Sequence, residues 1–205
     1  MLETWNPLGK IGIISAFNFP CAVHGWNSCV SMIAGNTQIW KGSPTTSLVS
    51  IAQTRMMAEV LMDNNIHGGV ATLCQGGHDI GNRIVEDNRL SLISFTGSTA
   101  VGREVAGKVA SRFGKSILEL GGNNAIVVMD DADLENAVPT ILFAAAGTAG
   151  QRCTTGRRII IHEKVYDKVK DALVAAYAQL KPGNPLDEKT LLGPLHSAAG
   201  VAQFE

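Results

Sequence analysis

Cys153 follows a glycine-containing turn and lies directly after Arg152, in the segment Gly150-Gln151-Arg152-Cys153-Thr154-Thr155. Positive charge from Arg152, or a helix N-terminus nearby, would favour the nucleophilic thiolate of Cys153. The alternative is an inert and buried thiol, which is the commoner fate of a free cysteine. These residues alone leave both interpretations open. The other three cysteines lie in apolar contexts, and we interpret them as inert: Cys21, Cys29 and Cys74.

A glutamate and an asparagine each follow a predicted strand, at the edge where parallel sheets place their active-site clefts. Glu119 lies near the end of the apolar run 116–120, and partial burial there would suit it to general-base catalysis. An ion pair with a basic neighbour is the alternative for Glu119, although the following Gly121-Gly122 lets a ligand or backbone come close. Asn18 follows the strand 10–15, and its amide is either a donor to a developing oxyanion or a helix cap.

Two glycine-containing segments and one lysine are candidates for binding phosphate or sugar. Residues 95–99 (Phe-Thr-Gly-Ser-Thr) end a strand and open a helix, so their N–H groups and the Ser98 hydroxyl suit a phosphate. Residues 75–81 also lie between strand and helix, but they do not form a G-x-G-x-x-G fingerprint. Helix N-termini of this kind also occur without ligands. Lys41 ends a short strand and is either a ribose contact or a solvated side chain.

Short β-rich runs alternate with longer helical patterns, which predicts βαβ units around a mainly parallel sheet and therefore an α/β fold. The predicted strands are 10–15, 39–41, 69–74, 90–95, 116–120, 125–129 and 158–162. The predicted helices are 45–62, 98–113, a helix capped by Asp133 that runs towards Gly147 and contains Pro139, and 165–180. We expect a domain boundary near Gly121-Gly122, which divides the chain into 1–121 and 122–205.

Composition and charge exclude several classes of protein. Hydrophobic residues make up 45% and charged residues 17% of the chain, which is ordinary globular usage. Lys plus Arg is 17 and Asp plus Glu is 18, so the net charge of −1 offers no electrostatic case for nucleic acid or an anionic membrane. We expect no membrane span, because no run of 18 apolar residues occurs, and no secretory signal is visible. The four cysteines show no metal-binding spacing, which predicts no metal site and reduced thiols in the cytoplasm.

Together these motifs resemble the NAD(P)-dependent aldehyde dehydrogenase superfamily. Five motifs stand in that family's order: Asn18-Phe19-Pro20, Lys41, Phe95-Thr96-Gly97-Ser98, Glu119-Leu120-Gly121-Gly122 and Gly150-Gln151-Arg152-Cys153. The separations 153 − 119 = 34 and 41 − 18 = 23 are also those of the family. Residues 16–20, 24–27, 40–47 and 118–125 resemble the antiquitin branch most closely, whose substrate is α-aminoadipic semialdehyde, an aldehyde of lysine catabolism.

The resemblance implies a Rossmann-like NAD-binding domain over 1–121 and the beginning of an α/β catalytic domain over 122–205. It implies that Cys153 attacks the aldehyde to form a thiohemiacetal, whose oxyanion Asn18 and the N–H of Cys153 stabilise. Hydride transfer leaves a thioester, and Glu119 activates the water that hydrolyses it. Arg152 and Thr154 are implied to hold the carboxylate end of the semialdehyde.

The implied cofactor is NAD and the implied partner is a small aldehyde, with no metal, nucleic acid or membrane. The implied cofactor contacts are Ser15, Ala16, Phe17, Lys41, Gly77, Gly81, Asn82, Gly97, Ser98, Glu119 and Leu120. Pro44 departs from many NAD-preferring relatives, which carry a ribose-binding glutamate there, but the antiquitin branch shares this proline.

Full-length family members have a segment before Trp5 and a long half after Glu205, and they form homotetramers, so we expect a truncated chain. One hypothesis is an NAD-dependent aldehyde dehydrogenase. The alternative is a non-catalytic remnant that binds nucleotide or associates with another chain. A cysteine hydrolase using Cys153 is disfavoured, because no histidine has the context of a catalytic partner.

Overall fold

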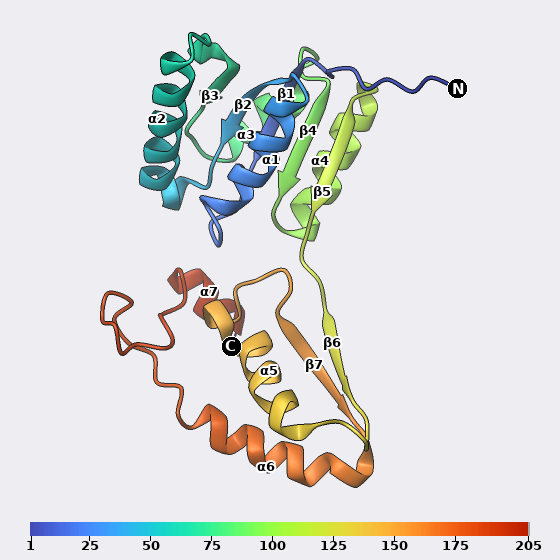
Figure 1. Ribbon diagram of the computed structural model, residues 1–205, viewed down its shortest axis with the longest axis vertical. Coiled ribbons are helices and arrows are strands. Elements are labelled where there is room, and N and C mark those ends of the chain that lie inside the picture. The colour runs from blue at the N-terminus through green and yellow to red at the C-terminus, as the bar shows by residue number, and fades with distance from the viewer. Residues whose placement is uncertain (205) are drawn as a thin grey trace. The chain divides into compact units, whose positions relative to one another are not determined.

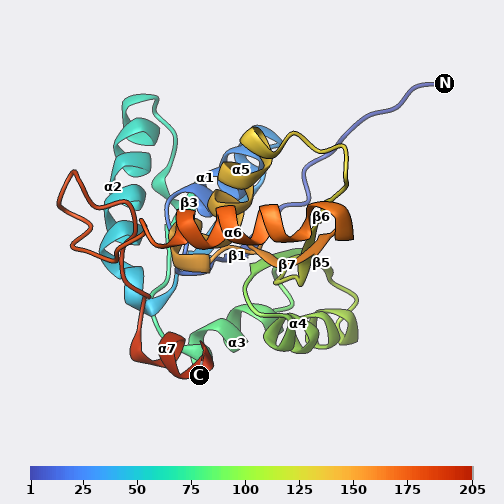
Figure 2. The ribbon, with the colours of Figure 1, turned by 90° about the horizontal axis from the view of Figure 1, so that it is seen from below.

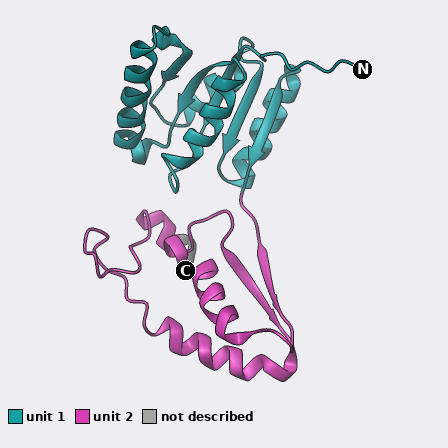
Figure 3. Ribbon diagram, viewed as in Figure 1, with its two compact units in different colours: residues 1–120 teal, residues 121–205 magenta. Residues whose placement is uncertain are grey.

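The chain divides into two compact units. The structure, a computed structural model, describes residues 1–204 and the side chains of residues 1–202. Unit 1 is Met1–Leu120 and unit 2 is Gly121–Glu205 (Figure 3). The division falls one residue before the boundary that the sequence suggests, and each unit has its own hydrophobic core.

Unit 1 is built on a five-stranded parallel sheet with the order β3-β2-β1-β4-β5 (Figure 1). Its strands are β1 (Lys10–Ile14), β2 (Thr37–Lys41), β3 (Ala71–Leu73), β4 (Leu92–Thr96) and β5 (Lys115–Glu119). Its helices are α1 (Ala22–Ile33), α2 (Ser47–Asp63), α3 (His78–Glu86) and α4 (Thr99–Ser111), with short 3-10 turns η1 (Pro44–Thr46) and η2 (Gly68–Val70). The predicted α/β fold with a parallel sheet is therefore confirmed.

Helices cover both faces of this sheet, as Figure 2 shows, with α1 and α2 on one face and α3 and α4 on the other. On the first face Trp40 packs with Ile11 and Ile13. On the second face Ile14 packs against Val105 of α4 within a larger apolar cluster. Burial on both faces explains why the strands are continuously apolar rather than alternating.

The ends of the predicted elements differ from those in the structure by up to three residues, and two of these differences have a local cause. The strand expected over 69–74 is shorter, because residues 68–70 form η2, in which Nδ1 of His67 accepts a hydrogen bond from the N–H of Gly69. The helix expected from Thr45 begins at Ser47, because Pro44–Thr46 first form the 3-10 turn η1. Neither difference moves the carboxyl end of a strand by more than one residue.

Up to residue 204, unit 2 contains a parallel pair of strands, β6 (Asn124–Val128) and β7 (Gly156–Ile161), and three helices. The helices are α5 (Leu134–Ala146), α6 (Tyr166–Tyr177) and α7 (Ala198–Phe204), with 3-10 turns η3 (Gly147–Gly150) and η4 (Glu163–Val165). Asp133 caps α5 as predicted, since its Oδ1 accepts from the N–H of Glu135 at 3.0 Å. Pro139 lies inside α5.

The core of unit 2 lies on one face of the two strands. Val128 of β6 packs with Ile141 of α5 and Val169 of α6. The alternate side chains Val127 and Ile160 point to the other face and are exposed. Unit 2 therefore has a helix-covered face and an open apolar face.

Two glycines of unit 1 should respond oppositely to an added methyl group. A Cβ on Gly12 would lie 2.8 Å from Cδ1 of Ile93 and 2.9 Å from Cγ2 of Ile84, whereas a Cβ on Gly107 of α4 would meet nothing within 4 Å. We expect Gly12→Ala to destabilise unit 1 by about 1–3 kcal/mol through overpacking. We expect Gly107→Ala to stabilise it by about 0.5–1 kcal/mol, because alanine is the better helix former. Urea unfolding followed by circular dichroism measures both, and equal effects of the two changes would contradict this packing.

Candidate functional site

The carboxyl ends of β1 and β2 bring Ser15 and Lys41 together. The N–H of Ser15 donates to the carbonyl of Lys41 at 3.1 Å, and Nε1 of Trp40 donates to Oγ of Ser15 at 2.8 Å. Ser15 and Trp40 are both buried. The chain that leaves β1 is therefore tied to the end of β2 by one backbone and one side-chain bond.

Lys41 is buried, since the residue is only 7% exposed, so the alternative of a solvated lysine is wrong. Its Nζ donates to the carbonyl of Gly42 at 3.1 Å. Its aliphatic stem passes Gly81 of α3, where an added Cβ would lie 3.8 Å from Cδ of Lys41. Burial lowers the pKa of Lys41 from its usual value. The structure thus brings together Lys41 and Gly81, two residues that the sequence assigned to the same ligand.

The ends of β4 and β5 are joined in the same way. Thr96 and Glu119 are register partners, and the N–H of Gly97 donates to the carbonyl of Glu119 at 3.0 Å. Ser98 caps α4, because its Oγ accepts from the N–H of Val101 at 3.3 Å. The Ser98 hydroxyl therefore already holds the helix terminus that was expected to meet a phosphate.

Glu119 itself is exposed, and the expected partial burial is wrong for this chain. The reason is local: β5 is an edge strand of the sheet and its outward side chains are exposed. The next residue, Leu120, anchors the strand end, since it packs against the core cluster and lies close to Gly102 of α4. Glu119 is thus held by its backbone while its carboxylate faces solvent.

Asn18 lies in the turn between β1 and α1 and does not cap the helix. The cap position of α1 is Cys21, which makes no side-chain capping bond. Oδ1 of Asn18 instead accepts from the N–H of Phe19 at 3.1 Å. Asn18 and its neighbours Ala16 and Phe17 are half-buried. Of the two alternatives for Asn18, helix capping is therefore excluded.

The start of α3 contributes Gly77 and Asn82. Gly77 takes the cap position of α3, one residue before the helix begins. Asn82 bridges two helices, since its Oδ1 accepts from Nζ of Lys108 in α4 at 3.0 Å and its Nδ2 lies 3.0 Å from Nδ1 of His78. The side chain of Asn82 is therefore part of a polar link between α3 and α4.

In unit 2, Cys153 lies on a turn that begins with three residues of positive φ. The φ values of Thr148, Ala149 and Gly150 are 56°, 52° and 72°. Only glycine adopts this left-handed conformation without strain, and Thr148 is β-branched. The thiol of Cys153 and the side chain of Thr154 are exposed. The interpretation of Cys153 as a buried thiol is therefore wrong, as is an apolar burial of Cys21 and Cys29, which are also exposed.

Arg152, which precedes the cysteine, has partners within the same turn. Its Nε donates to Oγ1 of Thr148 at 2.8 Å, and its guanidinium carbon lies 4.7 Å from the ring centroid of Phe143 in α5. The cation–π contact and the hydrogen bond direct the guanidinium towards the end of α5. The positive charge of Arg152 is thus fixed close to the turn that carries Cys153.

Three residues that bond these positions were not singled out from the sequence. Trp40 was placed in the strand 39–41 and in a segment of the resemblance, with no contact assigned to it, yet it bonds Ser15. Asn124 and Thr155 hold the turn of Cys153 by hydrogen bonds to its backbone. The sequence signal for Asn124 and Thr155 was a polar side chain next to an apolar strand in the first case and next to Cys153 in the second.

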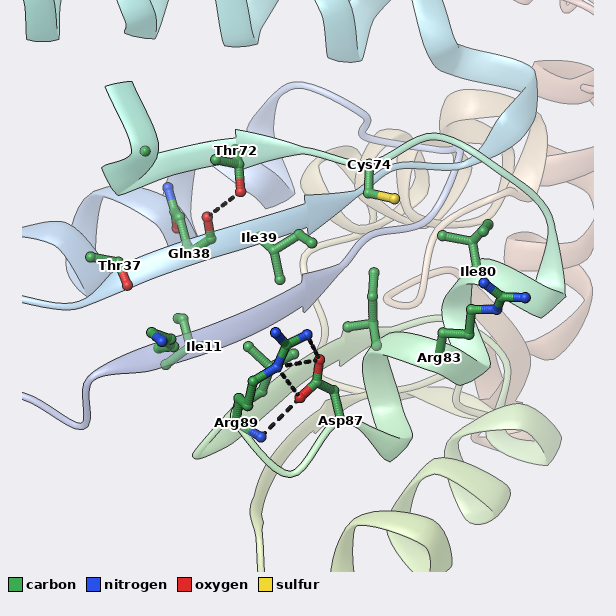
Figure 4. Close-up of a pocket in the computed structure, with 14 residues that line it drawn as sticks. Ile11, Thr37, Gln38, Ile39, Thr72, Cys74, Ile80, Arg83, Asp87 and Arg89 are labelled. Atoms are coloured by element: carbon green, nitrogen blue, oxygen red, sulfur yellow. Dashed lines mark hydrogen bonds and ion pairs between the residues drawn. The ribbon is translucent and has the colours of Figure 1, made fainter. Parts of the chain in front are cut away.

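A cavity of about 440 Å³ in unit 1 lies along the α3 face of the sheet (Figure 4). Ile39 and Cys74 line it from the strand side and Ile80 and Arg83 from α3. None of the residues assigned to the cofactor lines it. It contains the ion pair of Arg89 and Asp87, whose atoms lie 2.6 Å apart, and the hydrogen bond from Arg89 lowers the pKa of Asp87 to about 2. The lining of this cavity therefore does not overlap with the assigned cofactor contacts, although Cys74 directly follows the carboxyl end of β3.

His24 of α1 packs flat against Trp40 beneath this edge. The two ring centroids are 3.5 Å apart with an interplanar angle of 7°, and His24 is 2% exposed. Its Nδ1 makes no hydrogen bond in the described part of the chain. Burial lowers the pKa of His24 from 6.5 to about 4, so this ring is neutral near pH 7.

Within residues 1–204, no group of three or more histidine, cysteine or acidic side chains is arranged to hold a metal ion. No helix of this range is both long and apolar enough to cross a membrane.

Comparisons with known proteins agree on one family. The aldehyde dehydrogenase family matches residues 1–205. The chain is 57% identical over 205 residues to aldehyde dehydrogenase family 7 member B4 of Arabidopsis thaliana, covering all of this chain and 40% of that protein. It is 55% identical over 204 residues to α-aminoadipic semialdehyde dehydrogenase of Bos taurus, of which it covers 38%.

A solved structure of betaine aldehyde dehydrogenase from Staphylococcus aureus in complex with NAD⁺ is 30% identical with a TM-score of 0.90. The match covers 94% of this chain and 38% of that one. The chain thus spans about 40% of the length of the curated relatives it matches.

The buried His24 predicts how stability depends on pH. Its folded pKa is depressed, so between about pH 6.5 and 4 the unfolded chain binds more protons than the folded one. Stability is therefore full above pH 6.5 and falls as the pH decreases towards 4. We expect unit 1 to lose about 2 kcal/mol between pH 7.5 and pH 5 from this residue. Urea unfolding at both pH values measures it, and His24→Phe, which keeps an aromatic ring on Trp40, should lose about 2 kcal/mol less than the wild type. Equal losses in the two proteins would contradict the assignment.

Proposed function

Because this chain belongs to the aldehyde dehydrogenase family, we propose that it carries the nucleophile and most cofactor contacts of an NAD-dependent aldehyde oxidation. The observation that carries the proposal is the exposed Cys153 thiol on a strained and heavily hydrogen-bonded turn. Strained backbone of this kind occurs most often at functional sites. In this proposal 1–121 is the NAD-binding domain and 122–205 is the beginning of the catalytic domain.

The carboxyl edge of unit 1 fits an anionic dinucleotide. The sheet order is that of dinucleotide-binding folds, whose ligands lie beyond the carboxyl ends of the strands. The first turn of α4 contains no acidic side chain, so its helix dipole is free to favour a diphosphate. Lys41 adds a buried cation at the same edge and suits the adenosine ribose. When bound, NAD accepts the hydride that leaves the substrate carbon.

The residues of the chain would act in the following order. Cys153 adds to the aldehyde carbon, and the amide of Asn18 and the N–H of Cys153 donate to the oxyanion. Loss of hydride from that carbon leaves a thioester on Cys153. Glu119 then removes a proton from the water that cleaves the thioester, and its exposed carboxylate is accessible to that water.

The proposed substrate is α-aminoadipic semialdehyde, on the strength of the 55% identity to the bovine enzyme of that name. Arg152 and Thr154 are the proposed contacts for its carboxylate end, because a guanidinium fork matches a carboxylate. For the full-length protein we propose a cytoplasmic homotetramer that acts in lysine catabolism, as the resemblance of residues 16–20, 24–27, 40–47 and 118–125 to the antiquitin branch implies.

Removal of the Cys153 thiol should abolish the reaction. We expect Cys153→Ala to lower the rate of NADH formation from NAD and α-aminoadipic semialdehyde by at least about 10³-fold, followed at 340 nm. Cys29→Ala removes another exposed thiol and should leave the rate unchanged. NADH production by the wild-type chain that survives Cys153→Ala would overturn the proposed nucleophile.

A chain that makes no NADH is tested for binding alone. An increase in melting temperature with NAD would then support the non-catalytic, nucleotide-binding alternative. Without such an increase, both forms of the proposal fail for this chain.

Glu119 should affect the second half of the reaction only. We expect Glu119→Gln to keep a rapid burst of about one NADH per Cys153 and to slow later turnover by about 10²-fold, because the thioester is no longer hydrolysed efficiently. Stopped-flow absorbance separates burst from steady state. A burst reduced as much as the steady-state rate would place Glu119 outside the hydrolytic step.

A further inference from the structure

Both peptide groups that flank Cys153 are held by hydrogen bonds. The peptide between Arg152 and Cys153 contains the N–H of Cys153 and the carbonyl of Arg152. That carbonyl accepts from the N–H of Thr155 at 3.2 Å. Because a peptide group is planar, a bond to its carbonyl also fixes the direction of its N–H.

The second flanking peptide, between Cys153 and Thr154, is held by a residue of strand β6. Its carbonyl, that of Cys153, accepts from Nδ2 of Asn124 at 2.7 Å, and the same Nδ2 donates to the carbonyl of Thr155 at 3.1 Å. Asn124 is the first residue of β6, where the pairing with β7 shifts register. The residue at this irregularity of the sheet, Asn124, is therefore the one whose side-chain amide binds the backbone of Cys153.

The hydroxyl of Thr155 closes the turn from inside. Its Oγ1 donates to the carbonyl of Gly150 at 2.9 Å and accepts from the N–H of Arg152 at 3.1 Å. Thr155 is 4% exposed, whereas Cys153 two residues earlier is exposed. One buried hydroxyl thus connects the positive-φ segment before the cysteine to the residues after it.

We propose that Asn124 and Thr155 are positioning residues that fix the N–H and thiol of Cys153 in the geometry for aldehyde addition. This inference rests on the proposed function. In the addition, the thiolate forms a C–S bond as the carbonyl π electrons move onto oxygen, and the Cys153 N–H donates to that oxyanion. A donor held in place before the reaction stabilises the oxyanion most, because no reorganisation is then required. Neither residue touches the reacting atoms.

A test on the chain as it exists uses reversible protection of Cys153 by an aldehyde. The protein is alkylated with iodoacetamide at increasing concentrations of propanal, and peptide mass spectrometry gives the alkylation rate at each cysteine. Addition of propanal to Cys153 slows its alkylation, and the midpoint concentration reports the stability of the adduct. The exposed Cys29 serves as the internal reference for the reagent.

Two variants remove the positioning bonds and two matched variants keep them. Asn124→Asp removes the Nδ2 donor, while Asn123→Asp places the same charge one residue earlier on an exposed side chain. Thr155→Val removes the hydroxyl at nearly constant shape, while Thr155→Ser keeps it. We expect the propanal midpoint for Cys153 to rise by about 10-fold or more in Asn124→Asp and Thr155→Val. It should change by less than about twofold in Asn123→Asp and Thr155→Ser.

Several outcomes would overturn the proposal. One is a propanal midpoint in Asn124→Asp equal to that of the wild type. If Thr155→Val shows no cooperative melting transition, the test relies on Asn124→Asp alone. Another is equal loss in Thr155→Val and Thr155→Ser, because the hydroxyl would then not be responsible.

If propanal does not protect Cys153 in the wild-type chain, then Cys153 is not the nucleophile of the proposed function. The positioning role of Asn124 and Thr155 is contradicted with it. If propanal protects Cys153 but the chain forms no NADH, the proposed oxidation is contradicted and the positioning role is still supported.

Discussion

The parallel pairing of β1 with both β2 and β4 is the constraint on which the arrangement of unit 1 depends. Parallel strands end at one edge, so Ser15, Lys41, Gly97 and Glu119 are brought to that edge although the first and last of them, Ser15 and Glu119, are 119 − 15 = 104 positions apart in the chain. The bonds from Ser15 to Lys41 and from Gly97 to Glu119 continue the sheet one residue beyond its strands. The candidate cofactor contacts are therefore held mainly by backbone geometry.

Unit 2 holds its cysteine by a different means. Three successive residues with positive φ carry the chain out of α5, and a non-glycine residue in that conformation costs about 1–3 kcal/mol. Such a turn persists only when its surroundings determine it. Asn124, Thr155 and the contacts of Arg152 with Thr148 and Phe143 provide that determination.

The sequence was sufficient to predict the alternation of strands and helices, because period and glycine punctuation are local properties. It also led to Cys153, Glu119 and Asn18 by residue type and order. It could not show the burial of Lys41, because burial depends on where α3 packs. The sequence also could not show the exposure of Glu119, because β5 lies at the edge of the sheet only as a result of the strand order. The roles of Trp40, Asn124 and Thr155 arise from contacts between residues 25 to 31 positions apart, or from one turn's three-dimensional closure.

In the proposed function, Cys153 forms a covalent acyl intermediate during NAD-dependent aldehyde oxidation. The most direct measurement is mass spectrometry of the protein quenched in acid after mixing with NAD and α-aminoadipic semialdehyde. We expect an acyl mass increase on the peptide that contains Cys153, dependent on NAD, and none on Cys21 or Cys29. An unmodified Cys153 peptide, or equal modification of all three cysteines, would contradict it.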